Sequence, residues 1–303
     1  MKPSALLSPS SAYRWLYLDV SSGDFTAVVI FMLGAPFSPR YSVEARRGAS
    51  PAHHCAVNLA VYEKGARHAW VLSEYGKADL DSAVRVRIGG SQWTYENDGS
   101  ATVVVSDHTA QWGEPTQALI SLVPESPRGP DTALVEGVPH FWQALAPRAW
   151  GRVTLPSLGL SFEGRAYHDT NHGDVMLGQG VQAWRWTRTH GPHATRIVYE
   201  PRGHGGLEVT ADATHVDVLR AVQPRAVEER RLGWGLRVPS SLSPIAGVPL
   251  EAPRILESSP FYARLEAVGD GHHAMTEVAD FARFHQPHIR WMADFRTRVG
   301  EAR

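Results

Sequence analysis

The chain has 303 residues, in which 30 Lys and Arg residues nearly balance 31 Asp and Glu residues. A net charge of −1 at pH 7 excludes the polybasic surface that nucleic acid or an anionic membrane would attract. The single cysteine, Cys55, excludes an internal disulfide framework and suits a reducing compartment. We therefore expect a soluble, cytoplasmic protein without a nucleic-acid partner.

Neither of two apolar segments fits a targeting or membrane signal. Residues 1–8 have too short an apolar run for a signal peptide. The longest apolar run, residues 27–35, is far below the roughly 20 residues that a membrane helix needs. If the protein contacts a membrane peripherally, we expect the apolar region 27–37 to make that contact.

The composition predicts an all-β protein. Ten Trp, nine Tyr and nine Phe accompany 27 Gly and 21 Pro, so short β-branched and aromatic runs are broken by turn residues, as in sandwiches and barrels. Residues 25–33 are nearly all apolar, which indicates a strand buried on both faces or one that lines an apolar pocket. Strands are predicted at 15–20, 25–33, 55–62, 68–74, 83–88, 92–95, 102–106, 117–124, 181–188, 195–200, 207–211, 215–222 and 230–238.

The C-terminal region has a different pattern. Residues 276–284 begin with an N-cap candidate, Thr276, and have helical spacing, which predicts a short helix. Residues 289–299 carry apolar side chains with a period of two, which predicts a closing strand. We predict two β domains, residues 1–176 and 177–303, with the boundary soon after Gly173.

Residues 164–173 concentrate polar and aromatic side chains after an alternating segment, 153–162, that is predicted to be a strand. Strand alternation would place Tyr167 and Asp169 on one face and His168 on the other. In an apolar cavity, desolvation would raise the pKa of the Asp169 carboxyl, and a protonated carboxyl beside a phenol can act as an acid catalyst. The alternative is a polar strand end whose side chains bond to neighbouring loops.

A second concentration lies at residues 138–142. Extended spacing places His140 and Trp142 on the same face. A single His beside aromatic residues is most often a packed, hydrogen-bonded core residue, and that interpretation stays open. If this strand neighbours the first motif, His140, Trp142, Tyr167 and Asp169 converge as base, cation-stabilising ring, donor and acid.

A metal site is a further interpretation. His168, Asp169 and His172 would offer N, O and N ligands, and residues 53–55 a second cluster. The glycines around the first cluster argue against the helix that would bring both His side chains to one face, so we expect no metal. The sequence has no Gly-rich phosphate loop, no G-x-S-x-G elbow and no nucleotide fingerprint. Cys55 is expected to be a small core residue.

Seven stretches together resemble the carotenoid 1,2-hydratase (hydroxyneurosporene synthase) family, in that family's order and over most of the chain. The resemblance implies a two-domain, lipocalin-like β-barrel or sandwich architecture. It also implies an enzyme that needs no cofactor and adds water to a terminal isoprenoid double bond of an acyclic carotene. The stretches are YLDV at 17–20, FSP at 37–39, HCAVNLAVY at 54–62, PHFW at 139–142, GRAYHDTNHG at 164–173, WRW at 184–186 and PFYAR at 260–264.

The residues on which that family is thought to depend match this chain one by one. They are His140, Trp142, Tyr167 and Asp169. The family usually has H-D-H-N-W-G, whereas this chain has Thr170 and His172 at the two variable places, which leaves the identity of the substrate open.

These residues suggest acid-catalysed hydration through a tertiary carbocation. Asp169 would donate the proton, Tyr167 would orient or relay it, Trp142 would face the cation and His140 would accept a proton from the attacking water. Hydrophobic substrate, an acyclic carotenoid or another isoprenoid or polyene, is expected to be bound by Trp184, Trp186, His168, Asn171, His172 and Asn58. Two alternatives stay open: a cofactor-free isoprenoid or polyene cyclase or pericyclic enzyme, and a lipocalin-type carrier of hydrophobic ligands.

Overall fold

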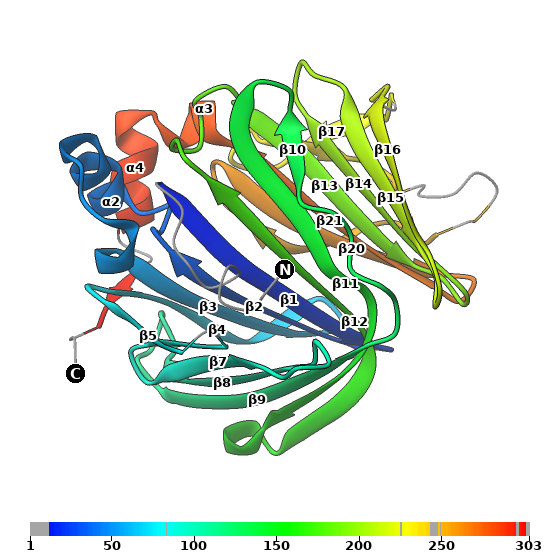
Figure 1. Cartoon of the computed structure of the whole chain (residues 1–303), viewed down its shortest axis with the longest axis horizontal. Coiled ribbons are helices and arrows are strands. Elements are labelled where there is room, and N and C mark those ends of the chain that lie inside the picture. The colour runs from blue at the N-terminus through cyan, green and yellow to red at the C-terminus, as the bar shows by residue number, and fades with distance from the viewer. Residues whose placement is uncertain are drawn as a thin grey trace.

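The structure is a computed structural model that describes residues 12–82, 84–224, 226–242, 248, 250–294 and 297–300. Two large, mainly antiparallel sheets lie one above the other, and short helices sit at one end of them (Figure 1). The predicted all-β class with a short helix near the C-terminus is confirmed. Within the described ranges, no helix has the length and apolar character that crossing a membrane requires.

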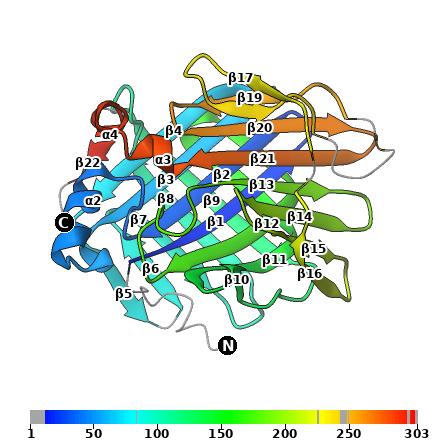
Figure 2. The ribbon, with the colours of Figure 1, turned by 90° about the horizontal axis from the view of Figure 1, so that it is seen from above.

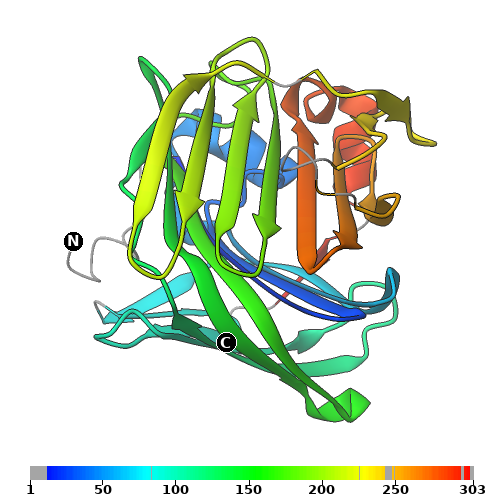
Figure 3. The same cartoon turned by 90° about the vertical axis from the view of Figure 1, so that its right-hand side faces the viewer.

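The first sheet curls on itself, as Figure 3 shows from the side. Phe31 on β2 meets Trp93 on β7 with ring centroids 5.6 Å apart, although several strands separate β2 from β7 in the sheet. The strand order is β22-β4-β3-β2-β1-β12-β11-β9-β8-β7-β6-β5, with β10 paired to β11. The strands are β1 (Tyr13–Ser22), β2 (Phe25–Leu33), β3 (Cys55–Glu63), β4 (Ala66–Tyr75), β5 (Ala78–Ser82), β6 (Arg85–Ile88), β7 (Ser91–Tyr95), β8 (Ala101–His108), β9 (Pro115–Pro124), β10 (Thr132–Val135), β11 (Val138–Leu155), β12 (Leu160–Gly173) and β22 (Arg298–Val299).

The second sheet lies across β1, β2 and β12 of the first (Figure 2). Its order is β16-β15-β14-β13-β21-β20-β19, and β17 pairs with β18 in a separate hairpin. These strands are β13 (Ala183–His190), β14 (Thr195–Pro201), β15 (Gly206–Ala211), β16 (Val216–Val222), β17 (Glu229–Arg231), β18 (Arg237–Pro239), β19 (Arg254–Ser258), β20 (Tyr262–Gly269) and β21 (His272–Asp280). The chain passes from the first sheet to the second between Gly173 and Ala183. The division of the chain into two domains remains a prediction.

β1 and β2 are buried on both faces because the curled first sheet covers one face and the second sheet covers the other. Leu18 and Phe31 belong to the core inside the first sheet, whereas Tyr17 and Met32 belong to the core between the sheets. Both interpretations of residues 25–33 therefore hold, since alternate side chains of β2 also line a cavity. The expected membrane contact at residues 27–37 is wrong, because this stretch is almost entirely buried.

The C-terminal predictions need correction. Residues 276–280 continue strand β21, because Thr276 pairs with Thr187 on one side and Leu265 on the other. Strand pairing overrides the helical spacing there, and the cap is Asp280, which opens the short helix α3 (Phe281–Phe284). The predicted closing strand at 289–299 is also wrong for most of its length, because α4 (Pro287–Asp294) is a helix that begins at a proline, a favoured first residue. Phe295 lies outside the described residues.

Two further segments contain turns that strand patterning did not reveal. The predicted strand 153–162 is a hairpin: β11 ends at Leu155, a 3₁₀ turn spans Pro156–Leu158, and Gly159 has a φ of +61°. The segment 230–238 is split between β17 and β18. The remaining helix, α2 (Pro39–Glu44), is followed by 3₁₀ turns at Ala45–Arg47 and Pro51–His53.

Candidate active site

β12 presents Tyr167 and Asp169 to the space between the two sheets, as strand alternation predicted. Both side chains are almost completely buried, and the Tyr167 hydroxyl donates a hydrogen bond of 2.6 Å to Asp169 Oδ2. His168 points the other way, into the first sheet, where its ring contacts Tyr95 and Trp93. One face of β12 therefore carries the candidate catalytic residues, and the other face packs into the core inside the first sheet.

The Asp169 carboxyl has two unlike oxygens. Oδ2 accepts a second hydrogen bond, of 2.8 Å, from Trp142 Nε1 on the neighbouring strand β11. Oδ1 is buried and has no hydrogen-bond partner among the described residues. Burial raises the pKa of this carboxyl to about 7, although the bonds from Tyr167 and Trp142 lower it. A carboxyl that is protonated near neutral pH can donate a proton.

The glycines at the two ends of the motif allow close packing around it. A Cβ on Gly164 would lie 2.2 Å from the backbone oxygen of Ser21 on β1. A Cβ on Gly173 would lie 2.6 Å from the Tyr13 ring and 2.8 Å from His140 Nδ1. Only glycine lets β12 run this close to its neighbours.

Aromatic rings surround the carboxyl and exclude water from it. Tyr17 of β1 contacts the Tyr167 ring at 6.0 Å and the Trp186 ring at 5.6 Å between centroids. Trp186 is 5.3 Å from Tyr167, and Trp142 meets Tyr199 edge-to-face at 5.8 Å. This group of rings is the source of the desolvation that raises the pKa of Asp169.

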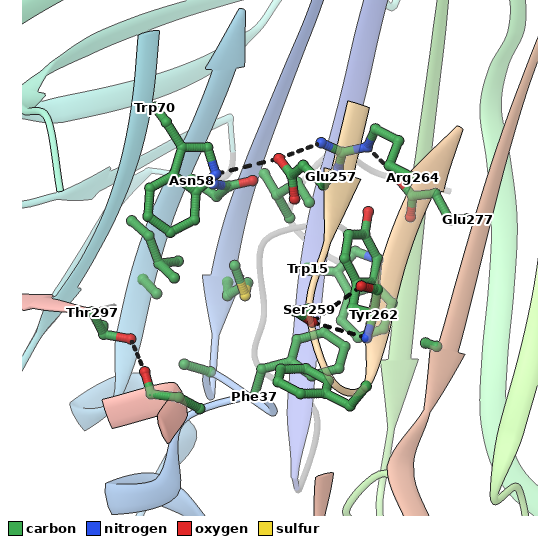
Figure 4. A pocket seen from close by; sticks show the side chains of 18 of the residues that line it. Trp15, Phe37, Asn58, Trp70, Glu257, Ser259, Tyr262, Arg264, Glu277 and Thr297 are labelled. Carbon is green, nitrogen blue, oxygen red and sulfur yellow. Dashed lines mark hydrogen bonds and ion pairs between the residues drawn. The ribbon is translucent and has the colours of Figure 1, made fainter. Parts of the chain in front are cut away.

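A cavity of about 390 Å³ opens between the sheets beside these rings. One end is aromatic, with Phe37 and Trp15, and the other carries a row of polar side chains (Figure 4). In that row, Trp70 Nε1 and Arg264 Nη1 donate to Glu257 Oε1 at 3.2 and 3.0 Å, and Arg264 Nε donates to Glu277 Oε1 at 2.9 Å. The cavity therefore combines largely apolar walls with a charged cluster at one end, and Glu74, which is paired with Arg40, also contributes to the lining.

Tyr17 lies between the cavity and the Asp169 carboxyl. It lines the cavity, whereas Asp169, Tyr167 and Trp142 do not. Tyr17 and Asp169 are directly paired residues of β1 and β12, so their side chains leave the sheet on the same face. A substrate in the cavity is thus separated from the acid by one aromatic layer.

The structure brings three of the four predicted catalytic residues together. His140 pairs with Gly173, four residues along β12 from Asp169, which corresponds to about 13 Å at the usual rise of a strand. Its Nε2 lies 2.8 Å from the backbone oxygen of Gln179, and its Nδ1 lies 2.9 Å from the Tyr13 hydroxyl. Both ring nitrogens are engaged, which matches the open interpretation of a hydrogen-bonded core residue.

The six residues predicted to bind substrate are dispersed. Trp184 and Asn58 line the cavity. Trp186 and Asn171 face the core between the sheets, where Asn171 Nδ2 donates to the Tyr199 hydroxyl at 3.2 Å. His168 lies inside the first sheet. His172 lies 3.1 Å from Asp131 at the other face of β12, so neither histidine reaches the cavity.

No group of three or more His, Cys, Asp or Glu side chains that could hold a metal is present in the described part of the chain. His168 and Asp169 point to opposite faces of β12, so they cannot share an ion with His172 as the metal interpretation requires. Cys55 is buried in the core of the first sheet, as expected.

Comparison with known proteins identifies the family. A family model described as "Carotenoid hydratase CrtC" matches residues 29–301. The chain belongs to the carotenoid hydratase CrtC family. The predicted family is thereby confirmed, and the protein is an enzyme of the carbon–oxygen lyase class.

Two curated relatives support this assignment, and one solved structure shares the fold. An acyclic carotenoid 1,2-hydratase of Thiocapsa roseopersicina is 32% identical, over 95% of this chain and 73% of that protein. An acyclic carotenoid 1,2-hydratase of Rubrivivax gelatinosus is 29% identical, over 84% of this chain and 64% of that protein. A crystal structure described as a putative AttH from Nitrosomonas europaea has the same fold, with a TM-score of 0.62, 13% identity and coverage of 89% of this chain and 93% of that one.

Sequence reasoning missed several residues of this carotenoid hydratase's cavity. Tyr17, Tyr262 and Arg264 lie in the stretches 17–20 and 260–264 that carry the family resemblance, and no role was assigned to them. Glu277 lies in no such stretch. Its position became evident only from the register that pairs it with both Arg264 and Trp186.

Proposed function

We propose that this carotenoid hydratase adds water to a terminal C=C bond of an acyclic carotenoid, or a related isoprenoid, by acid catalysis without a cofactor. The supporting observation is the Asp169 carboxyl, buried among aromatic rings with a pKa of about 7. Family membership supports a carotenoid as the substrate. No nucleic-acid partner is part of this proposal.

The hydrogen bonds assign the proton to one oxygen. Asp169 Oδ2 accepts from both Tyr167 and Trp142, so the acidic proton resides on Oδ1. Burial keeps the pKa of the Tyr167 phenol well above its ordinary value, so Tyr167 remains a donor throughout. Because the Tyr17 ring lies between the cavity and Asp169, the alkene must pass this ring to reach Oδ1. When Oδ1 then transfers its proton to the less substituted alkene carbon, the two donors at Oδ2 stabilise the carboxylate that forms.

The resulting tertiary cation lies among electron-rich rings. A cation–π contact contributes roughly 0.5–2 kcal/mol, whereas enzymes lower barriers by about 8–23 kcal/mol. Trp142 and its neighbours therefore supply a minor share. Proton delivery by a positioned acid and exclusion of bulk water from the cation supply the rest.

His140 has no place in this chemistry. Its two nitrogens are occupied and it lies far along β12 from the acid, so its role in this proposal is to hold β11 against Tyr13 and the loop at Gln179.

The size of the cavity restricts how a long substrate is bound. A volume of about 390 Å³ lies near the lower end of small-molecule pockets, which span roughly 300–1,000 Å³. We therefore propose that one end of the polyene enters and the remainder stays outside, with the protein peripheral to a membrane. α4 supplies Ala293 to the cavity wall and carries Trp291, whose exposed fraction is 65%. Tryptophan is favoured at membrane interfaces.

The test is incubation of the purified protein with neurosporene and with lycopene in detergent, followed by mass spectrometry. The proposal expects a product heavier by one water molecule, and a rate at least about 100-fold lower for Asp169→Asn, the scale of general acid catalysis. An isomer of unchanged mass would indicate a cyclase, and unmodified bound lipid a carrier. Hydration by Asp169→Asn at the parental rate would refute the role of Asp169.

A further inference from the structure

Hydration requires a group that accepts a proton from the attacking water, and the resemblance-based candidate, His140, is not at the site. The polar end of the cavity offers other carboxylates. A hydrocarbon gains nothing from buried charges, so the cluster of Glu257, Arg264 and Glu277, to which Trp70 is bonded, needs another explanation. This inference rests on the proposed function.

Glu277 is at the centre of the second sheet and faces the first sheet. Alternation along β21 places it on the same face as Met275 and Ala279, which belong to the core between the sheets. Across the sheet its paired residues are Trp186 on β13 and Arg264 on β20. Glu277 therefore lies on the wall opposite β1 and β12.

The row opposite Glu277 contains the acid. Asn58, Ile30, Tyr17 and Asp169 are successive paired residues across β3, β2, β1 and β12. Trp186, the neighbour of Glu277, contacts both Tyr17 and Tyr167. The two carboxyl groups thus approach the same aromatic layer from different sheets, with Asp169 behind it and Glu277 in the cavity.

The two carboxyl groups have opposite environments. Asp169 has no cation within its hydrogen-bonding set and is enclosed by rings. Glu277 is bonded to the guanidinium of Arg264, whose side chain is only 1% exposed, while 14% of the Glu277 side chain remains accessible. A carboxyl enclosed by rings and a second carboxyl bonded to a guanidinium are the kind of unlike environments from which acid and base roles are assigned.

We propose that Glu277 binds the attacking water and takes its proton, with Arg264 as the positioning residue. The alkene π electrons take the proton of Asp169 Oδ1, and a tertiary cation forms. The water oxygen forms the C–O bond while one of its O–H bonds breaks and that proton goes to Glu277. One water is added, and transfer of the proton from Glu277 to solvent and from solvent to Asp169 restores both groups.

The charged and titratable groups that face Glu277 come from several elements. Arg264 and Tyr262 lie on β20 and Glu257 on β19, while Tyr17 and Asp19 lie on β1 and Tyr167 and Asp169 on β12. Among them only Arg264 is a bonded cation of Glu277. Asp19 is neutralised by Arg188 of the second sheet, at 2.5 Å.

The test compares Glu277→Gln with Glu200→Gln, which removes the ion-paired carboxylate of Arg185 on the second sheet, outside the cavity. The proposal expects Glu277→Gln to lower kcat by about 100-fold or more with little change in KM. Added formate should restore turnover in Glu277→Ala, because a small carboxylate can then accept the proton of the water. Glu200→Gln should keep the parental kcat. Glu277→Asp should retain turnover at a reduced rate.

Three results would overturn the inference. Glu277→Gln could keep the parental kcat, or Glu200→Gln could lower kcat by as much as Glu277→Gln, which would mean that loss of any ion-paired carboxylate of the second sheet has this effect. Absence of water addition by the parental protein would overturn the proposed function and this inference together, and so is distinct from the first two. Thermal melting of each variant checks that it is folded.

Discussion

Tyr17 and Asp169 are directly paired across β1 and β12, and of these two residues Tyr17 lines the cavity whereas Asp169 does not. The Tyr17 hydroxyl donates to the sulfur of Met275 at 3.2 Å, a weak acceptor, so the ring is held mainly by its contacts with Tyr167 and Trp186. This ring separates the acid from the cavity. It therefore controls the access of both the alkene and water to Asp169.

Replacing Tyr17 tests this separation. In Tyr17→Ala, water reaches the Asp169 carboxyl, desolvation weakens and its pKa falls from about 7 toward the ordinary range. We expect the alkaline limb of the kcat/KM profile to move to lower pH by about one unit or more. Tyr17→Phe keeps the ring and is the matched control, with the limb unmoved. An unmoved limb in a folded Tyr17→Ala variant would show that other rings exclude the water.

Asp169 also makes stability depend on pH. The folded state holds its carboxyl protonated up to about pH 7, whereas the ordinary pKa of an aspartate is 3.8. Between these values the native state binds more protons than the unfolded state, so stability falls as pH rises. Asp169→Asn does not ionise. Relative to the parent, we expect its stability to rise as the pH increases from 3.8 to about 7, by up to roughly 4 kcal/mol, and the difference to stay constant above that pH. Urea unfolding at several pH values measures this, and a pH-independent difference would contradict it.

Strand alternation was sufficient to predict the local geometry of the site. It placed Tyr167 and Asp169 on one face and His168 on the other, because a period of two follows from backbone geometry alone. It also placed His140 and Trp142 on one face of their strand. It could not give the register of β11 against β12, which brings Trp142 to the carboxyl and leaves His140 four residues away.

The same limit explains the other differences. Val278, Phe281 and Ala282 satisfy helical spacing, yet Val278 belongs to a strand and the other two to a helical turn, because β21 pairs on both sides up to Asp280. Glu277 has no distinctive local sequence. Its partners come from residues 186 and 264, and such distant contacts are decided by the packing of the sheets.

The ion pair between Asp19 and Arg188 joins the two sheets and gives a test of their packing. Both side chains are completely buried, 2.5 Å apart, and Asp19 Oδ2 and Arg188 Nε have no partner among the residues described. Removing one partner leaves a buried charge, so we expect Asp19→Asn to cost about 3–5 kcal/mol. The double variant Asp19→Leu/Arg188→Met should be less destabilised than either single variant in urea unfolding. Additive losses would show that the pair is not coupled.

His168 is expected to affect stability rather than the choice of substrate. Its ring nitrogens lie 2.7 Å from the Tyr95 hydroxyl and 2.6 Å from the backbone oxygen of Tyr17, and burial lowers its pKa to about 4 from 6.5. The folded state therefore favours the neutral ring. This stability is present above pH 6.5 and is lost as pH falls through about 4, a change of roughly 3 kcal/mol.

His168→Asn removes this titration, so we expect a variant that is less stable at pH 7, because a buried hydrogen bond is lost. Its free energy of unfolding should depend less on pH between 6.5 and 4. The ratio of kcat/KM values for neurosporene and lycopene should stay the same, because His168 does not reach the cavity. His172→Asn, on the same face of β12 but beside Asp131, is the matched control and should also keep the parental substrate ratio. A change in substrate ratio for His168→Asn without loss of stability would mean that the ring acts on the substrate.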